Sequence, residues 1–316
     1  MRLRITHDTR YRYEPPVLTA VHMTHLTPPP TRCQDRLDAR LQVHPQPASI
    51  TESLDIYRNV RTFFEIASPH DELLVRASSL VETYAPDPVG STLAWDAVRD
   101  SFVYHVGAEW HPAAEFIYPS HYVHPGEVFA DYARPSFPPG RPLIDAAREL
   151  MQRVHQDFTY ASRSTEINTP AAEALAQRRG VCQDFSHVML ACLRSLGLPA
   201  RYVSGYLLTQ PPPGQPRLVG SDASHAWVAV FLPDVAAQHG GHGWYDLDPT
   251  NDRHGWGAPG EDFVRLAVGR DYADISPMRG VIHGGAGHEL DVGVTVEPCD
   301  AASLAEAPPL PTDPFR

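Results

Sequence analysis

Two segments in the middle of the chain place hydrophobic residues at the spacing of an α-helix. After Pro142, a residue favoured at a first helical position, apolar side chains recur every three or four residues as far as Val154. A second apolar stripe occupies 185–196 and is followed by Gly197, which is typical of a helix C-terminus. Both patterns predict helices that lie against a core, and the second helix is expected to begin near Cys182.

Other segments follow the two-residue period of β-strands. Residues 1–84 contain aromatic and β-branched runs broken by proline, histidine and aspartate, which predicts a small antiparallel sandwich. A further strand pair is expected at 264–268 and 290–296. Three apolar runs that follow the second helix are also typical of strands: 200–208, 225–232 and 243–248.

The elements together predict an α+β protein, because a helix packed on an antiparallel sheet is the layout of that class. We expect a β-rich N-terminal domain at 1–84, a connector with short helices at 85–140 and a second domain at 141–298. Residues 299–316 are rich in proline and are predicted to form a disordered tail. The proline-rich loop 210–222 is either a lid or a linker, and the sequence leaves both open.

Composition limits the partners of the protein. All 26 basic residues are arginine, and 38 acidic residues give a net charge of −12, so neither nucleic acid nor an anionic membrane surface is expected to bind. No segment has the pattern of a signal peptide or the ~18 apolar residues of a membrane span, and a cytoplasmic location is expected. The four cysteines have no paired spacing, which predicts free thiols and no zinc site.

Three residues in separate motifs suggest nucleophilic chemistry. Cys182 follows a glycine turn at the start of the second helix, where the helix dipole favours the thiolate, and the thiolate is the nucleophile. His225 opens one strand, 43 residues after Cys182, and Asp248 ends another, 23 residues after His225. A base must reach the thiol, and its far ring nitrogen needs an acceptor, which Asp248 can provide. Asp246 faces the same side of its strand and is the alternative acceptor.

Residues beside these three have less specific roles. Gln183 could contribute to an oxyanion site or to the helix N-terminus. Trp227 is expected either to pack in the core or to line the substrate pocket. The other cysteines lack a comparable setting, because Cys192 lies inside the apolar stripe while Cys33 and Cys299 lie in turn-like sequence.

At these motifs the chain resembles the bacterial transglutaminase-like superfamily, in particular the two-domain subgroup with a β-rich N-terminal region. The resemblance implies a papain-like core, in which the nucleophile helix packs on an antiparallel sheet. It also implies a catalytic triad of Cys182, His225 and Asp248, with the backbone amide of Cys182 as an oxyanion donor. The matching segments are Gly-Val-Cys-Gln-Asp-Phe at 180–185, Gly-Leu-Pro-Ala-Arg-Tyr at 197–202, Ser-His-Ala-Trp at 224–227, Asp-Pro-Thr-Asn at 248–251 and 265–272.

The implied reaction is acyl transfer through a thioester on Cys182, with an amide or peptide bond as the donor. The substrate is expected to be a protein, a peptide or a small amide. Water as the acceptor makes the protein a protease or amidase and an amine makes it a transglutaminase, and we favour hydrolysis. The alternative is a non-catalytic scaffold that binds a partner. Because the chain has no acidic cluster like the calcium sites of animal transglutaminases, no metal or cofactor is expected.

Overall fold

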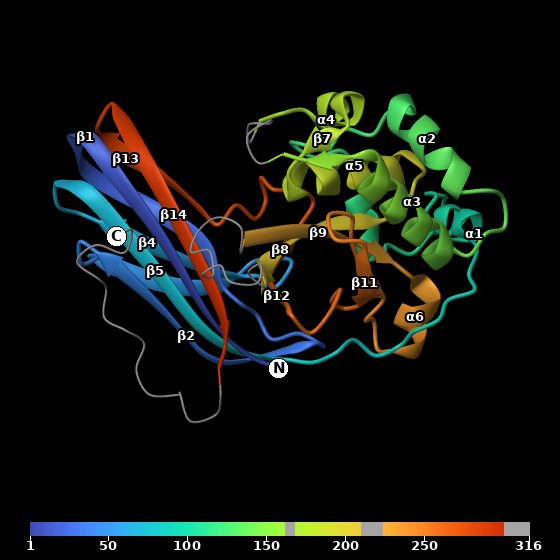
Figure 1. Ribbon diagram of the computed structural model, residues 1–316, viewed down its shortest axis with the longest axis horizontal. Helices are drawn as coiled ribbons and strands as arrows, with labels where there is room; N and C mark the ends of the chain where they lie inside the picture. Colours follow the sequence, from blue (N-terminus) through green and yellow to red (C-terminus); the bar gives the residue numbers. More distant parts are fainter. Residues whose placement is uncertain (162–167, 210–223, 300–316) are drawn as a thin grey trace, which may run out of the picture.

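The computed structural model describes residues 1–161, 168–209 and 224–299. The predicted tail beyond residue 299 and the loop 210–222 therefore lie outside the described residues. Two units lie side by side (Figure 1): a sheet formed by both ends of the chain, and an α+β unit formed by its middle. We call them the sheet unit and the α+β unit. This arrangement is the expected α+β fold with a β-rich N-terminal region.

The sheet unit is a single antiparallel sheet of seven strands built around the 26-residue strand β1. Along one side, β1 pairs first with β5 and then with β4; along the other, it pairs with β14 and then with β13. Strands β2 and β3 extend the sheet beyond β5 and β4. Its strands are β1 (Arg2–Thr27), β2 (Gln34–His44), β3 (Ser49–Leu54), β4 (Val60–Ile66), β5 (His70–Thr83), β13 (Met278–Gly284) and β14 (Gly287–Pro298).

Two strand predictions were wrong. The N-terminal region does not form a sandwich, because the second layer against its inner face is the α+β unit, which supplies Tyr206, Val264 and Leu266 to their shared core. The segments 264–268 and 290–296 do not pair with each other either. The first belongs to a strand of the α+β unit, whereas the second pairs with β1, so the expected domain 141–298 is divided between the two sheets.

The α+β unit packs most of its helices on one face of a five-stranded antiparallel sheet of order β11-β10-β9-β8-β12. Among the described residues, no helix is long and apolar enough to cross a membrane. Its helices are α1 (Trp95–Ser101), η1 (Pro112–Ile117), α2 (Glu127–Ala133), η2 (Arg134–Ser136), α3 (Leu143–Asp157), α4 (Ala171–Gln177), α5 (Cys182–Ser195) and α6 (Pro233–Gln238). Its strands are β8 (Ala200–Leu207), β9 (Ser224–Phe231), β10 (Trp244–Asp248), β11 (Arg253–Trp256), β12 (Phe263–Gly269) and the short parallel pair β6 (Thr159–Tyr160) and β7 (Arg179–Gly180).

The two amphipathic helices of the sequence prediction are confirmed as α3 and α5. Helix α5 is almost entirely buried between β8, β9 and the other helices, which agrees with its apolar stripe. It ends before Gly197, whose φ of +76° lies in the left-handed region that glycine adopts without strain. Because the body of α5 is buried, only its first turn is free to take part in a site.

Two buried side-chain amides join the units. The side chain of Asn59 donates to the carbonyl of Val268 at 2.7 Å and accepts from the same residue's N–H at 2.8 Å. Gln34 makes the same pair of bonds to Arg265, at 2.8 and 2.7 Å. Both partners lie on β12, the outer strand of its sheet, so the amides satisfy backbone groups that an edge strand leaves unpaired.

Replacement of Asn59 with alanine is expected to lower the free energy of unfolding by about 2 kcal/mol or more, because it leaves a buried N–H and a buried carbonyl without partners. Urea unfolding of both proteins measures the difference. Asn168→Ala is the matched control, since Asn168 is exposed and a change of about 0.5 kcal/mol or less is expected there. Equal effects of the two substitutions would contradict the assigned role of Asn59.

Candidate active site

The first turn of α5 explains the Gly-Val-Cys-Gln-Asp sequence. Helix α5 begins at Cys182, and the N–H of Val181 donates to Asp184 Oδ2 at 2.8 Å, so the carboxylate folds back over the start of the helix. A Cβ atom at residue 180 would lie 2.5 Å from that carboxylate oxygen, and only Gly180 leaves room for it. Asp184 therefore stabilises the helix start, and the half-buried thiol of Cys182 lies at the positive end of the helix dipole.

The histidine and aspartate come from two adjacent antiparallel strands. His225 lies at the start of β9 and Asp248 at the end of β10, and the ring Nε2 donates to Asp248 Oδ2 at 2.8 Å. The side chain of His225 is also hydrogen-bonded to Cys182, for which the other ring nitrogen, Nδ1, remains. The structure thus brings Cys182, His225 and Asp248 together in one continuous chain of contacts.

Asp248 is held by a turn that the sequence analysis did not interpret. It is fully buried, and its Oδ1 accepts the N–H of Thr250 at 2.9 Å, while its Oδ2 accepts the side-chain amide of Asn251 at 2.8 Å. An aspartate that accepts the N–H two residues later is a common turn, and the Asp-Pro-Thr-Asn sequence contains the signal for it. Asn251 therefore helps to position the carboxylate that receives His225.

The sequence left Asp246 and Asp248 as alternative acceptors for His225, and the structure gives them separate roles. Asp246 accepts a hydrogen bond from Trp227 Nε1 at 2.7 Å and lies fully buried. Burial raises the pKa of Asp246, although the nearby guanidinium groups of Arg201 and Arg265 oppose the rise. Asp248, and not Asp246, is thus the carboxylate paired with His225.

The charges around His225 favour its protonated form. Burial by itself lowers the pKa of His225, but the neighbouring Asp248 carboxylate and the contacts with Cys182 outweigh it and raise the pKa to about 10. An imidazolium at neutral pH is the partner that a thiolate needs. A protonated His225 in contact with Cys182 is the arrangement that a cysteine–histidine ion pair requires, and it gives the histidine a proton to donate.

A cleft of about 390 Å³ lies in front of the thiol, between the two units. Gln183 lines this cleft, as the sequence analysis allowed. Of the two roles expected for Trp227, the structure shows packing, because its side chain is 1% exposed and does not line the cleft. Its indole ring stacks on the imidazole at 6.0 Å between centroids, and it packs so closely on Gly205 that a Cβ there would lie 2.6 Å from the ring. Trp227 is therefore a positioning residue.

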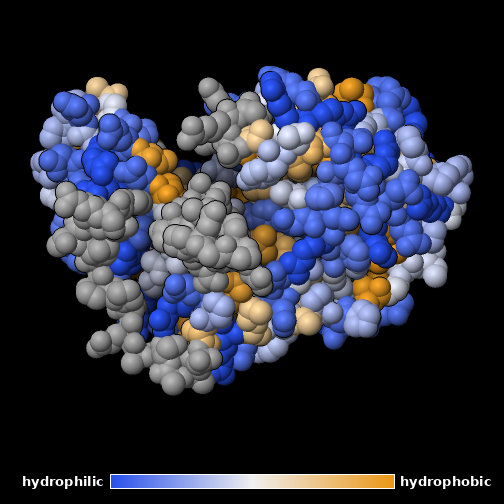
Figure 2. Space-filling view, in the orientation of Figure 1, coloured by the Kyte–Doolittle hydropathy of each residue, from blue (hydrophilic) through white to orange (hydrophobic). Residues whose placement is uncertain are grey.

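The far wall of the cleft comes from the sheet unit, which the sequence analysis did not foresee. His7 and Tyr11 of β1 and Leu290 and Val292 of β14 face the thiol from across the cleft. The ring Nδ1 of His7 lies 3.0 Å from the hydroxyl of Tyr206 on the opposite wall. Figure 2 shows a notch between the units on a surface that is mostly hydrophilic. The sheet unit thus builds one wall of the site.

These features define an α+β protein with a cysteine, a histidine and an aspartate in a papain-like arrangement. Residues 131–249 match the transglutaminase-like superfamily, and residues 3–82 match the bacterial transglutaminase-like N-terminal region. The chain belongs to the transglutaminase-like superfamily and carries the N-terminal region of its bacterial members. The family predicted from the motifs is therefore confirmed.

Two of three relatives match almost the whole chain, and the third matches part of it. The protein Rv2569c of Mycobacterium tuberculosis is 39% identical over 96% of this chain and 95% of its own length, and ML0607 of Mycobacterium leprae is 32% identical over 93% and 98%. A protein-glutamine gamma-glutamyltransferase of Pseudomonas aeruginosa is 30% identical over 39% of this chain and 18% of its own. The two mycobacterial relatives therefore match both units, whereas the P. aeruginosa relative matches only part of the chain.

A solved structure has the same fold. A Cytophaga hutchinsonii protein, named a candidate cysteine protease, superposes with a TM-score of 0.69 at 21% identity over 95% of this chain and 92% of its own. Because the match covers nearly all of both chains, it includes the sheet unit and the α+β unit together.

Proposed function

We propose that this protein is a cysteine hydrolase that cleaves an amide or peptide bond through a thioester on Cys182. The contact chain from Cys182 through His225 to Asp248 carries the proposal. Membership of a superfamily whose members are generally cysteine-dependent enzymes supports it. The aromatic and aliphatic walls of the cleft favour an extended peptide segment as the substrate.

In the proposed reaction, the Cys182 thiolate attacks the carbonyl carbon of the scissile amide. Backbone N–H groups at the start of α5 point toward the carbonyl oxygen as it gains negative charge. His225 then gives its proton to the departing amine as the C–N bond breaks, which leaves a thioester and a neutral imidazole. Water gives a proton to that imidazole and attacks the thioester, and the released acid and the free Cys182–His225 pair complete the cycle.

An amine in place of water would make the same thioester a transfer intermediate. The name of the P. aeruginosa relative makes protein glutamine the first acyl donor to examine for this alternative. We favour water because it reaches an open cleft without a binding site of its own, whereas an amine must be held beside the thioester to compete. Mass spectrometry of the products with and without added amine distinguishes an acid from an amine conjugate.

Brief treatment with iodoacetamide near neutral pH tests the activated thiol. Cys182 is expected to be alkylated at least about 100-fold faster than Cys33 and Cys192, because thiolates are the reactive form. Burial raises the pKa of Cys33 to about 11 and also raises that of Cys192, so both remain protonated. Intact-mass measurement and peptide mapping follow the label at each site.

The same experiment on variants tests the ion pair. His225→Ala is expected to remove the preference for Cys182, whereas His105→Ala, which replaces an exposed histidine, is expected to keep it. Labelling that is slow at Cys182, or that is unaffected by His225→Ala, would mean that the thiol is not activated. The protein would then be examined as a scaffold for a binding partner.

A further inference from the structure

A second and larger cavity, of about 1000 Å³, lies between the sheet unit and the five-stranded sheet. It shares no lining residue with the cleft at Cys182. His225 of the cleft and Arg201 of the cavity lie on the same face of the five-stranded sheet, since His225 pairs with Gly205 and, four residues further along β9, Ala229 pairs with Arg201. Trp227 lies between these two positions on β9 and lines neither site.

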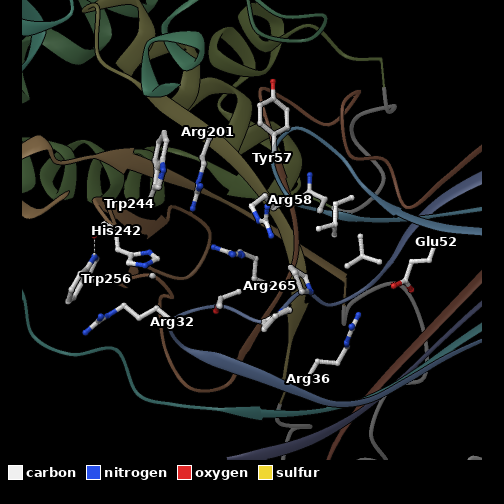
Figure 3. Close-up of a pocket in the computed structure, with 17 residues that line it drawn as sticks. Arg32, Arg36, Glu52, Tyr57, Arg58, Arg201, His242, Trp244, Trp256 and Arg265 are labelled. Atoms are coloured by element: carbon white, nitrogen blue, oxygen red, sulfur yellow. Dashed lines mark hydrogen bonds between the residues drawn. The ribbon is translucent and has the colours of Figure 1, made fainter. Parts of the chain in front are cut away.

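Arginine is the dominant polar residue of this cavity. Figure 3 shows Arg58, Arg201 and Arg265 directed toward its centre from three separate segments, with Arg32 and Arg36 further along its wall. Arg58 belongs to the sheet unit, whereas Arg201 and Arg265 lie on β8 and β12. Guanidinium groups from distant parts of the chain thus converge on one space.

Four of these arginines have no partner within the described part of the chain. The side chains of Arg36, Arg58, Arg201 and Arg265 form no ion pair or hydrogen bond with a described residue, and the Nε atoms of Arg201 and Arg265 are buried without one. In a chain of net charge −12, acidic partners are not scarce. The described residues therefore supply no hydrogen-bonding partner for these four guanidinium groups.

Arg76 and Arg194, the two other arginines that are buried as whole residues in the described part of the chain, form hydrogen bonds. Arg76 binds the Asp8 carboxylate through two nitrogens at 2.6 and 2.7 Å. Arg194 donates to the carbonyl of Ala200 at 2.9 and 3.1 Å and to the hydroxyl of Ser120 at 3.1 Å. Arg201 is also buried, at 9% exposure against 5% for Arg76 and 3% for Arg194, yet its guanidinium only stacks over Trp244 at 4.2 Å. Such stacking leaves the N–H groups at the edge of the guanidinium plane available to an oxyanion.

The charge of the cavity is positive even when its nearest carboxylates are counted. Glu52 lies in the wall and Asp87 pairs with Arg32. The Asp246 carboxylate attracts the guanidinium groups of Arg201 and Arg265 electrostatically. Five arginines against these three carboxylates leave two positive charges uncompensated. Burial lowers the pKa of Arg201 to about 9, and a bound anion would offset this by stabilising the charged guanidinium.

The backbone holds part of the cluster in place. Arg58 has a φ of +64°, in the left-handed region that a side chain adopts at a cost of about 1 kcal/mol. The carboxylate of Asp55 fixes this turn by accepting the N–H groups of Tyr57 and Asn59 at 2.9 and 2.8 Å. On β12, the pairing register shifts between Arg265 and Ala267, and such bulges re-aim side chains.

We propose that this cavity binds a small polyanion, a molecule that carries phosphate or several carboxylate groups. The planar guanidinium groups offer paired N–H donors to its oxygen atoms, and the rings of Tyr57, Trp244 and Trp256 supply apolar walls for the rest of the molecule. The site is separate from the hydrolytic cleft, so it does not depend on the function proposed for Cys182.

Isothermal titration calorimetry of the full chain at low salt tests the site with two probes, pyrophosphate and citrate. At least one is expected to bind with a one-to-one stoichiometry and an affinity that falls as salt is added. Binding of pyrophosphate alone would assign the site to phosphates, and binding of citrate alone would assign it to polycarboxylates. Absence of binding by either probe at about 10 mM would overturn the proposal.

Variants separate a built site from attraction by overall charge. Arg58→Gln and Arg36→Gln, at positions that are not fully buried, are each expected to weaken binding about tenfold or more. Arg40→Gln removes the same charge from β2 outside the cavity and is expected to change the affinity less than twofold. A loss of affinity that is equal in all three variants would also overturn the proposal. Thermal unfolding of each variant confirms that it is folded.

Discussion

Replacement of Cys182 with alanine is expected to abolish amide hydrolysis, with a fall in kcat/KM of at least about 10⁴-fold. The thiol supplies the bond that holds the acyl group, and no neighbouring side chain can form an equivalent thioester. His225 and Asp248 keep their contact in this variant, because their hydrogen bond does not involve the thiol. The measurement is the rate of product release from a peptide amide, compared at equal concentrations of folded protein.

Cys299→Ala is the matched control for the loss of a thiol. Cys299 is also partly accessible, but it lies at the end of β14 and does not line the cleft. Its replacement is expected to leave the rate within about twofold of the wild type. A Cys182→Ala protein that is folded and retains a tenth or more of the activity would show that the thiol is not the nucleophile.

The local part of this site could be predicted from the sequence. The Gly-Val-Cys segment before an apolar stripe indicates a helix that begins at Cys182, and the structure has that helix from Cys182 to Ser195. The strands that carry His225 and Asp248 are likewise evident from their alternation and from the proline that follows Asp248. Short-range patterns of this kind specify which residues begin or end an element, and sites built at such ends become visible in them.

The contribution of the sheet unit to the site could not be predicted in this way. Tyr11 and Leu290 pair in the register of β1 and β14, although they lie at opposite ends of the chain, and both face the cleft. An alternating strand can pair with many partners, and only packing against the α+β unit selects one. The arginine cavity escapes the sequence for the same reason, because Arg58 and Arg265 meet only in the folded protein.

The choice between Asp246 and Asp248 shows where periodicity stops being informative. Both carboxylates lie on one face of β10, so strand geometry alone makes them equivalent. They differ in the donor that each one meets on β9, where Trp227 reaches Asp246 and His225 reaches Asp248. A side-chain pairing across two strands decides the assignment, and substitutions can test it.

Replacement of Asp248 is expected to weaken the reaction strongly and to change its pH dependence. Asp248→Ala removes the group that orients His225 and is expected to lower kcat/KM by about 10²- to 10⁴-fold. In the wild type, His225 must be protonated to release the amine, and its pKa of about 10 means that kcat/KM falls as the pH rises through that value. Asp248→Asn keeps an acceptor but removes the negative charge, so the alkaline fall is expected to move toward neutral pH.

Asp246→Asn is the matched control, because it removes a buried negative charge from the same strand without removing the carboxylate that pairs with His225. Asp246 does not contribute to the raised pKa of His225, and an amide oxygen can still accept the hydrogen bond from Trp227. The kcat/KM of the Asp246→Asn variant is expected to stay within about threefold of the wild type, and its alkaline fall is expected at the same pH. The measurement is the pH profile of kcat/KM for the wild type, Asp248→Asn and Asp246→Asn. An alkaline fall that moves in Asp246→Asn and not in Asp248→Asn would assign the partner of His225 to the other aspartate.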